Sequence, residues 1–99
     1  MYIDVIEYEL ADGITEAMLQ VAAADILETW MKQQPGFISW DINKKESGYM
    51  DFVYWENKAA ADAATQNMSD IPPDHAWLAC YKPNSISTTK LTPVASYKN

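Results

Sequence analysis

The one histidine in the chain, His75, is the first candidate for chemistry. A neutral imidazole near pH 7 can take a proton from a phenol or a quinol. His75 follows the Pro72–Pro73 break, where a lid over a pocket could lie. The sequence therefore makes His75 the candidate catalytic proton acceptor, and the alternative is a partly exposed surface histidine at a helix start.

Two aspartates form a second candidate group. Asp41 and Asp51 lie in adjacent predicted strands, Phe37–Lys44 and Gly48–Glu56. If the residue numbers of paired positions sum to about 92, the two carboxylates face each other. In a dry pocket they would then share one proton, which could serve as an acid or a base. The alternatives are a register that differs by one residue, or two solvated carboxylates at a rim.

Aromatic side chains are dense enough to form a ligand site. Trp55, Phe37 and Tyr49 could stack on a flat aromatic ligand, and Trp30 and Trp77 could close the pocket from the helices. The alternative is an ordinary core, because the chain has four tryptophans that must be accommodated somewhere.

The other reactive residues predict neither a metal nor a cofactor. Cys80 has no evident neighbouring cation to lower its pKa, which indicates an inert buried thiol. His75 and Cys80, with Asp70 and Asp74 nearby, do not make a convincing tetrahedral metal site. The sequence has no glycine-rich phosphate loop, so a flavin or nicotinamide would lack its usual cradle.

Charge narrows the range of partners. The net charge is −7, with seven lysines and no arginine. Nucleic acids and anionic membranes are recognised by clustered cations, so neither is an expected partner, and a neutral or weakly acidic organic ligand fits better. A single cysteine and an N-terminus without a signal-peptide pattern favour a cytoplasmic location. No apolar run approaches the roughly 20 residues that span a bilayer.

The first half of the chain predicts a strand, a helix and a hairpin. Tyr2–Leu10 alternates imperfectly and predicts a strand. Thr15 is a candidate N-cap for an amphipathic helix that ends before Pro35–Gly36. The strands Phe37–Lys44 and Gly48–Glu56 then fold back on each other around a Lys45–Glu46–Ser47 turn.

The second half predicts another helix and a last strand. Asn57 caps a helix over Lys58–Met68, whose contact face consists of alanines. Asp74–Tyr81 predicts a short extra helical segment. Ser85–Tyr97 predicts the last strand, with Pro93 at an edge or a bulge.

This element order predicts a single α+β domain over residues 1–99. With right-handed crossovers and antiparallel pairing, the expected topology for this element order is the ferredoxin-like βαββαβ plait, a four-stranded antiparallel sheet with both helices on one face. The hairpin carries large apolar side chains on both faces, so the face without helices should form a homodimer with a second copy of the chain. In the assumed register, one hairpin face is wholly apolar and consists of Ile38, Trp40, Ile42, Met50, Phe52 and Tyr54.

Two short motifs carry a family resemblance. Pro35–Gly36–Phe37 opens the second strand, and Val53–Asn57 (VYWEN) ends the third strand before an alanine-rich helix. In these features the chain resembles the antibiotic-biosynthesis-monooxygenase superfamily. The resemblance implies a dimeric α/β barrel with a pocket between sheet and helices in each subunit. It also implies cofactor-independent oxygenation of aromatic polyketides or quinols, the activity of several members.

The haem-degrading branch of that superfamily implies a different set of residues. It requires an asparagine on the first strand, a tryptophan in the second helix and a histidine further on. Tyr2–Leu10 has no asparagine, and the other two positions fall at about Ala63 and near Pro73. The resemblance therefore favours the oxygenase branch over haem degradation.

The leading hypothesis is a homodimeric, cofactor-independent monooxygenase-like protein acting on an aromatic or quinone-type small molecule. The ligand site would consist of Trp55, Phe37 and Tyr49, with His75 as proton acceptor. The first alternative is a non-catalytic homodimeric module that binds a small hydrophobic metabolite. A further alternative, an amino-acid-sensing plait, rests only on the Asp12–Gly13–Ile14 turn.

Overall fold

The computed structural model describes residues 1–99, with four strands and two α-helices in the predicted order. Three short 3-10 helices lie between them, at Met31–Gln33, Met68–Asp70 and Leu78–Cys80. The strands and α-helices are β1 (Tyr2–Tyr8), α1 (Glu16–Thr29), β2 (Phe37–Lys44), β3 (Tyr49–Trp55), α2 (Lys58–Asn67) and β4 (Ser87–Leu91).

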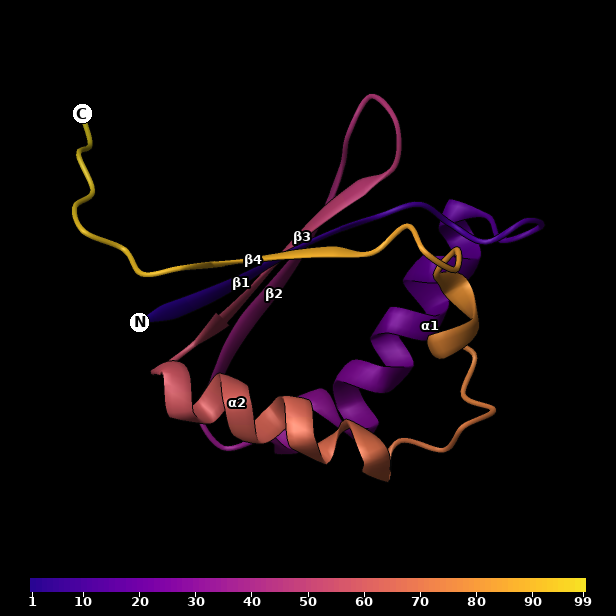
Figure 1. The fold of residues 1–99 in the computed structure, drawn as a ribbon, viewed down its shortest axis with the longest axis horizontal. Coiled ribbons are helices and arrows are strands. Elements are labelled where there is room, and N and C mark those ends of the chain that lie inside the picture. The colour runs from indigo at the N-terminus through magenta and orange to yellow at the C-terminus, as the bar shows by residue number, and fades with distance from the viewer.

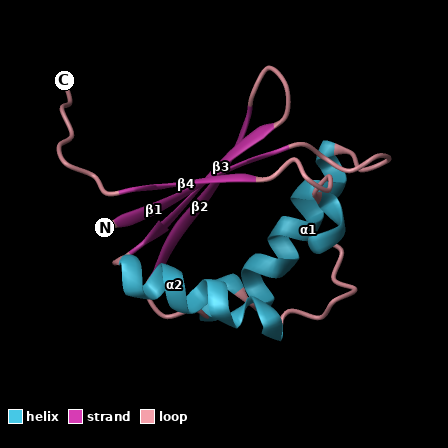
Figure 2. Ribbon diagram, viewed as in Figure 1, coloured by secondary structure: helices cyan, strands magenta, loops and turns pink.

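The four strands form one antiparallel sheet in the order β2-β3-β1-β4. Both α-helices lie on the same side of this sheet (Figures 1 and 2). Two βαβ halves interleaved in this way are the ferredoxin-like plait, so the predicted fold class is confirmed. No helix combines the length and the apolar character needed to span a bilayer.

Both predicted helix caps are confirmed. The Thr15 hydroxyl accepts a hydrogen bond from the backbone N–H of Met18 at 3.2 Å, and the Asn57 side chain accepts one from the N–H of Ala60 at 2.9 Å. Such caps satisfy donors that the first helical turn leaves unpaired. They fix where α1 and α2 begin, and hence which helix faces reach the sheet.

The hairpin register differs by one residue from the assumed one. The turn has four residues, Lys45–Gly48, closed by a 2.8 Å hydrogen bond from the Lys45 N–H to the Gly48 carbonyl. Gly48 has φ 98°, a conformation that favours glycine in turns and does not suit a strand. Lys44 therefore lies opposite Tyr49, and every pair beyond it shifts accordingly.

A bulge at Ile38 limits this shift to part of the hairpin. The register breaks between Phe37 and Ser39, so Phe37 remains opposite Trp55 as predicted. Beyond the bulge, Trp40 lies opposite Val53. The predicted wholly apolar face is therefore wrong, because Trp40 and Ile42 lie on the helix side and not beside Met50, Phe52 and Tyr54.

The predicted facing of Asp41 and Asp51 is also wrong. Asp41 lies opposite Phe52, and Asp51 lies opposite Ile42. Since successive strand residues point to opposite faces, the two carboxylates lie on different sides of the sheet. They cannot share a proton.

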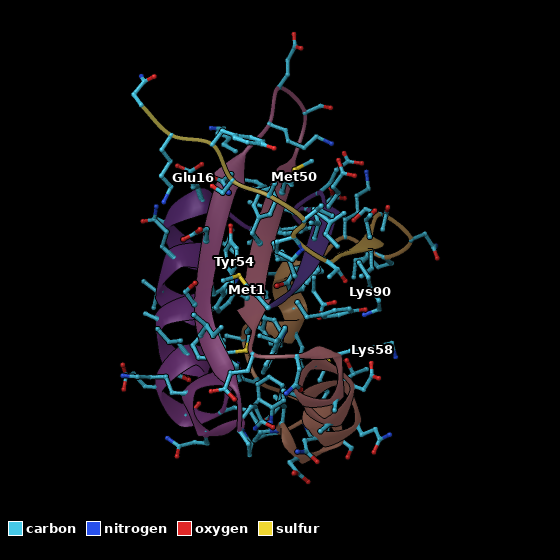
Figure 3. All side chains as sticks on the ribbon, turned by 90° about the vertical axis from the view of Figure 1, so that its left-hand side faces the viewer. Met1, Glu16, Met50, Tyr54, Lys58 and Lys90 are labelled. Atoms are coloured by element: carbon cyan, nitrogen blue, oxygen red, sulfur yellow. The ribbon has the colours of Figure 1, made fainter.

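The side of the sheet without helices keeps an apolar centre. Ile3 and Val5 of β1 lie opposite Tyr54 and Phe52 of β3 on this face. The Phe52 and Tyr54 rings stack at 6.5 Å. No other element of the chain packs over this face in Figure 1. Two of its residues, Met50 and Tyr54, are labelled in Figure 3. We call this surface, made of Ile3, Val5, Glu7, Ser39, Asp41, Asn43, Met50, Phe52, Tyr54, Ser87, Thr89 and Leu91, the open sheet face.

Two predicted elements are shorter in the structure. β4 ends at Leu91 and not at Tyr97, and the remaining residues extend away from the sheet without regular structure (Figure 1). Pro93 lacks a backbone N–H and cannot extend the ladder. The predicted helical segment Asp74–Tyr81 contains only the 3-10 turn Leu78–Cys80.

Candidate active site

A cavity of about 570 Å³ lies between the helix side of the sheet, the second half of α2 and the segments that follow α1 and α2. All four strands contribute to it, and 12 of its 19 lining residues are hydrophobic. Its size and apolar character are those of a small-molecule site. The lining includes Asp4, Trp30, Trp40, Asp51, Trp55, Trp77, Tyr81, Lys82, Thr88 and Lys90.

Asp51 is the more deeply buried of the two carboxylates that line this cavity, with an exposed fraction of 1% against 9% for Asp4. Its Oδ1 accepts a hydrogen bond from the Tyr8 hydroxyl at 2.9 Å, and its Oδ2 accepts one from the Trp40 indole N–H at 3.0 Å. Burial raises the pKa of Asp51 to about 6, although the two donors act in the opposite direction. A carboxyl group with this pKa can exchange a proton near neutral pH.

Two tyrosines surround Asp51 and stay protonated. Burial and the Asp51 charge raise the pKa of Tyr8 and of Tyr81 far above the ordinary value. The Tyr8 ring lies 4.7 Å from the Tyr81 ring and 5.7 Å from the Tyr49 ring. Asp51 is therefore the group in this cluster that changes protonation near pH 7.

The four tryptophans that line the cavity differ in how their indole N–H groups are used. Trp30 donates to the Asn67 carbonyl at 3.2 Å, and Trp40 donates to Asp51. The N–H groups of Trp55 and Trp77 are both buried. Trp77 interacts with the Tyr81 hydroxyl and partly offsets the rise in the pKa of Tyr81, whereas the Trp55 N–H has no hydrogen-bond partner in the protein.

Cations lie at the β4 side of the cavity. The Lys90 ammonium is 2.9 Å from Asp4, and this hydrogen bond raises the pKa of Lys90. In Figure 3, Lys90 and Lys58 project on the same side of the molecule. Lys82 also lines the cavity but belongs to no ion pair.

The structure brings part of the predicted ligand site together. Trp30, Asp51, Trp55 and Trp77 all line the cavity.

Three other predicted ligand residues lie elsewhere. Phe37 packs edge-on against Trp55 at 5.7 Å, and Tyr49 donates to the carboxylate of Glu16 at 2.9 Å. Neither lines the cavity. Asp41 is on the open sheet face, so it cannot reach the ligand site of its own subunit.

His75 does not line the cavity. Its Nε2 is 2.6 Å from Asp25 Oδ2 on α1, and its Nδ1 accepts the backbone N–H of Trp77 at 3.0 Å. Both ring nitrogens are therefore engaged by the protein. The position of His75 suits it to hold Trp77 in the cavity wall better than to touch a ligand.

Sequence reasoning misses Trp40, Tyr8 and Tyr81. The three-residue turn expected from the sequence, Lys45–Glu46–Ser47, places Trp40 on the open sheet face. Counting Gly48 as a fourth turn residue places Trp40 on the helix side, where the structure has it. Tyr8 and Tyr81 are far apart in the sequence and meet only through the fold. No single stretch of sequence signals that Tyr8 bonds Asp51 or that Tyr81 lies close enough to feel its charge.

No group of three or more His, Cys, Asp or Glu side chains is placed to hold a metal ion. Cys80 is buried, its thiol donates to the Ala76 carbonyl, and burial raises its pKa. This environment disfavours the thiolate, in line with an unreactive cysteine.

Neither a protein-family model nor a curated protein sequence matches the chain. Solved structures do match. SnoaB, a cofactor-independent oxygenase from Streptomyces nogalater, has 15% identity and a TM-score of 0.75, with 99% of this chain and 97% of that chain covered. The monooxygenase ActVA-Orf6 of Streptomyces coelicolor, solved with nanaomycin D, has 13% identity and a TM-score of 0.68, with 99% and 91% covered.

A mutant of MhuD, solved with two manganese protoporphyrin IX molecules per active site, is also similar. It has 16% identity and a TM-score of 0.76, with 100% of each chain covered. At these identities the comparisons establish the fold. The resemblance to the antibiotic biosynthesis monooxygenases that the sequence predicts is thereby confirmed at the level of structure.

Proposed function

We propose that this protein is a cofactor-independent oxygenase of an aromatic or quinol-type small molecule, with Asp51 as the proton acceptor. The observation that carries the proposal is the position of Asp51, a buried carboxylate with a pKa of about 6 in an apolar, tryptophan-rich cavity. The fold is shared with oxygenases that need no cofactor. That similarity supports the reaction class and leaves the substrate to be found.

The reaction needs little from the protein beyond binding and proton removal. Once a phenol or quinol has lost its proton to Asp51, its electron-rich ring can itself reduce oxygen. The indole rings would hold the flat substrate, and the apolar walls would exclude water from the anion. Tyr8 and Trp40 orient the carboxylate through their hydrogen bonds.

The cavity suits haem less well. No histidine lines it, so the imidazole that often ligates haem iron is missing from the site. The residues that the haem-degrading branch implies are also absent from the corresponding positions of the sequence.

We further propose that the protein is a homodimer that joins two open sheet faces. An exposed apolar sheet surface of this kind is rare in monomers, because it costs free energy in water and invites association. A two-fold axis would pair the face with itself. The dimer would bury the Phe52 and Tyr54 rings.

Oxygen uptake tests the proposed activity. The purified protein would be incubated with hydroxylated anthraquinones and naphthoquinols, and oxygen consumption compared with that of buffer. Asp51→Asn should lose about 10²-fold or more of the rate, the scale of a general base. His75→Ala is the matched comparison, and it should lose far less because His75 lies outside the cavity.

The outcome separates enzyme from binding module. If ligands bind but oxygen is never consumed faster than in buffer, the oxygenase proposal fails. If His75→Ala abolishes uptake and Asp51→Asn does not, His75 is the base after all.

One observation favours the alternative, a non-catalytic binding module. Both oxygens of Asp51 already accept hydrogen bonds from protein donors. A carboxylate satisfied in this way could serve only to order the Tyr8 and Trp40 side chains. Binding without oxygen use would support this function.

A further inference from the structure

Asp4 is the second carboxylate of the cavity lining, and one of its oxygens is unused by the protein. Its Oδ1 lies 2.9 Å from the Lys90 ammonium, whereas its Oδ2 accepts no hydrogen bond from the protein. The residue is only 9% exposed, yet Oδ2 is not sealed from solvent as the indole nitrogens of Trp55 and Trp77 are. A carboxylate oxygen is an acceptor, so Asp4 offers one hydrogen-bond acceptor to whatever fills the space beside it.

The position of Asp4 in the sheet shows where this oxygen points. β1 is an inner strand, with β3 on one side and β4 on the other. Asp4 lies opposite Val53 of β3 and Lys90 of β4, and all three residues line the cavity. An inner-strand side chain on this face reaches solvent only through the space between the sheet and the helices. The free Oδ2 of Asp4 therefore borders the cavity.

Lys90 supports this carboxylate and leaves one oxygen free. Its ammonium pairs with Oδ1 of Asp4 and lies 5.8 Å from the centre of the Tyr2 ring. The hydrogen bond to Asp4 raises the pKa of Lys90, so the lysine keeps its charge at neutral pH. A buried carboxylate needs a cation of this kind nearby. Asp4 can therefore stand in an apolar cavity and still accept a hydrogen bond from a ligand.

Asp4 and Asp51 lie on the same face of two adjacent strands. Asp4 is opposite Val53 and Ile6 is opposite Asp51, so the two carboxylates form a diagonal pair across β1 and β3. Diagonal neighbours of this kind are roughly 7–8 Å apart. A flat aromatic ligand with a donor group at each end can bridge such a spacing, with one donor directed to each carboxylate.

We infer that Asp4 is a specificity-determining residue, which selects ligands that carry a second hydrogen-bond donor, such as a hydroxyl, at the end remote from Asp51. The inference rests on the proposed function, in which the first hydroxyl loses its proton to Asp51. It narrows the ligand class to neutral aromatics with at least two hydroxyls. A ligand carboxylate does not fit at this end, because it would bring a further negative charge next to Asp4.

Matched naphthols test the role of Asp4. Binding of 1-naphthol, 2-naphthol and the 1,4-, 1,5- and 2,6-dihydroxynaphthalenes would be measured by titration calorimetry without oxygen, so that no probe is consumed. At least one dihydroxy probe should bind the wild type about ten-fold more tightly than the naphthol with one hydroxyl fewer, the scale of a hydrogen bond to a charged group. Asp4→Val removes the acceptor with a side chain of similar shape and should abolish this preference.

Three further variants make this result specific. Asp62→Val is the matched control, because it breaks the ion pair with Lys58 outside the cavity lining and should leave the preference intact. Asp51→Asn should also keep the preference, since the second hydroxyl is bound by Asp4. Asp4→Asn keeps the shape and one acceptor oxygen without the charge, so it should reduce the preference and provides the test if Asp4→Val does not fold.

Four results would overturn the role of Asp4. The first two are equal affinity of the wild type for naphthols with one and two hydroxyls, and binding of none of these probes. The third is a preference that survives in folded Asp4→Val or is unchanged in Asp4→Asn. The fourth is a preference that is lost only in Asp51→Asn.

These results can be told apart from a failure of the proposed function, because binding is measured without oxygen. A preference that depends on Asp4, in a protein that consumes no oxygen, would leave this assignment standing and remove the oxygenase. Oxygen uptake by a protein whose affinities are the same in the wild type and in Asp4→Val would remove the assignment and leave the oxygenase.

Discussion

The indole N–H of Trp40 lies 3.0 Å from Oδ2 of Asp51, across the β2–β3 hairpin. This contact exists because the hairpin turn contains Gly48, which puts Trp40 on the helix side of the sheet. One position in a turn thereby decides whether Asp51 receives a second hydrogen bond, from Trp40, in addition to the one from Tyr8.

Trp40→Phe should raise the pKa of Asp51 above about 6, because a donor to the charged form is lost. It should also cost about 1–3 kcal/mol of stability, as expected for a hydrogen bond to a charged group. The pH dependence of oxygen uptake would then shift to higher pH. Trp30→Phe is the control, since its N–H donates to a backbone carbonyl and its loss should not move the profile.

Asp51→Asn should remove a pH dependence of stability. The pKa of Asp51 is raised to about 6 in the folded protein, so the folded state holds the proton more firmly than the unfolded chain. Wild-type stability therefore falls as pH rises from about 4 to about 6, by at most about 3 kcal/mol. Urea unfolding of both proteins at a series of pH values checks this prediction. If the unfolding free energies of the two proteins change in parallel between about pH 4 and pH 6, the prediction is wrong.

Oxygen uptake by the wild type should rise with pH through about 6, because the base acts when Asp51 is ionised. In Asp51→Asn the residual rate should no longer rise with pH through about 6. In His75→Ala the rate should still rise with pH in this range. If the rise disappears only in His75→Ala, His75 is the proton acceptor.

Gly48→Ala should destabilise the protein more than Gly13→Ala. Both glycines have positive φ, 98° and 81°, so each alanine is strained by about 1–2 kcal/mol. A Cβ at Gly48 would also lie 2.6 Å from the Tyr8 carbonyl oxygen, whereas one at Gly13 meets nothing within 4 Å. Thermal unfolding of the two variants gives the comparison, and equal losses would mean that the turn adjusts without moving β1.

Phe52→Glu should prevent the proposed dimer, because it places a charge in the apolar centre of the open sheet face. Size-exclusion chromatography with light scattering should show monomer or aggregate. Val21→Glu is the control, as Val21 is 73% exposed on α1 and its change should leave the assembly intact. A well-folded wild-type monomer at micromolar concentration would refute the dimer.

The sequence by itself determined the element order, both helix caps and the strand-turn-strand hairpin, and these suffice for the ferredoxin-like plait. They could be predicted because each depends on neighbouring residues, such as Thr15 with Met18 or Asn57 with Ala60. The size and position of Trp55, Trp77 and Trp30 also indicate ligand-site residues from the sequence.

The tertiary structure alone decided the register, and with it the site. A one-residue difference in the turn moves Trp40 to the other face and separates Asp41 from Asp51, because strand side chains alternate. Likewise, the Tyr8 hydroxyl reaches Asp51 only through the pairing of β1 with β3. Local patterns fix which elements form, whereas the contacts that tune a buried carboxylate join residues distant in sequence and depend on how the elements pack.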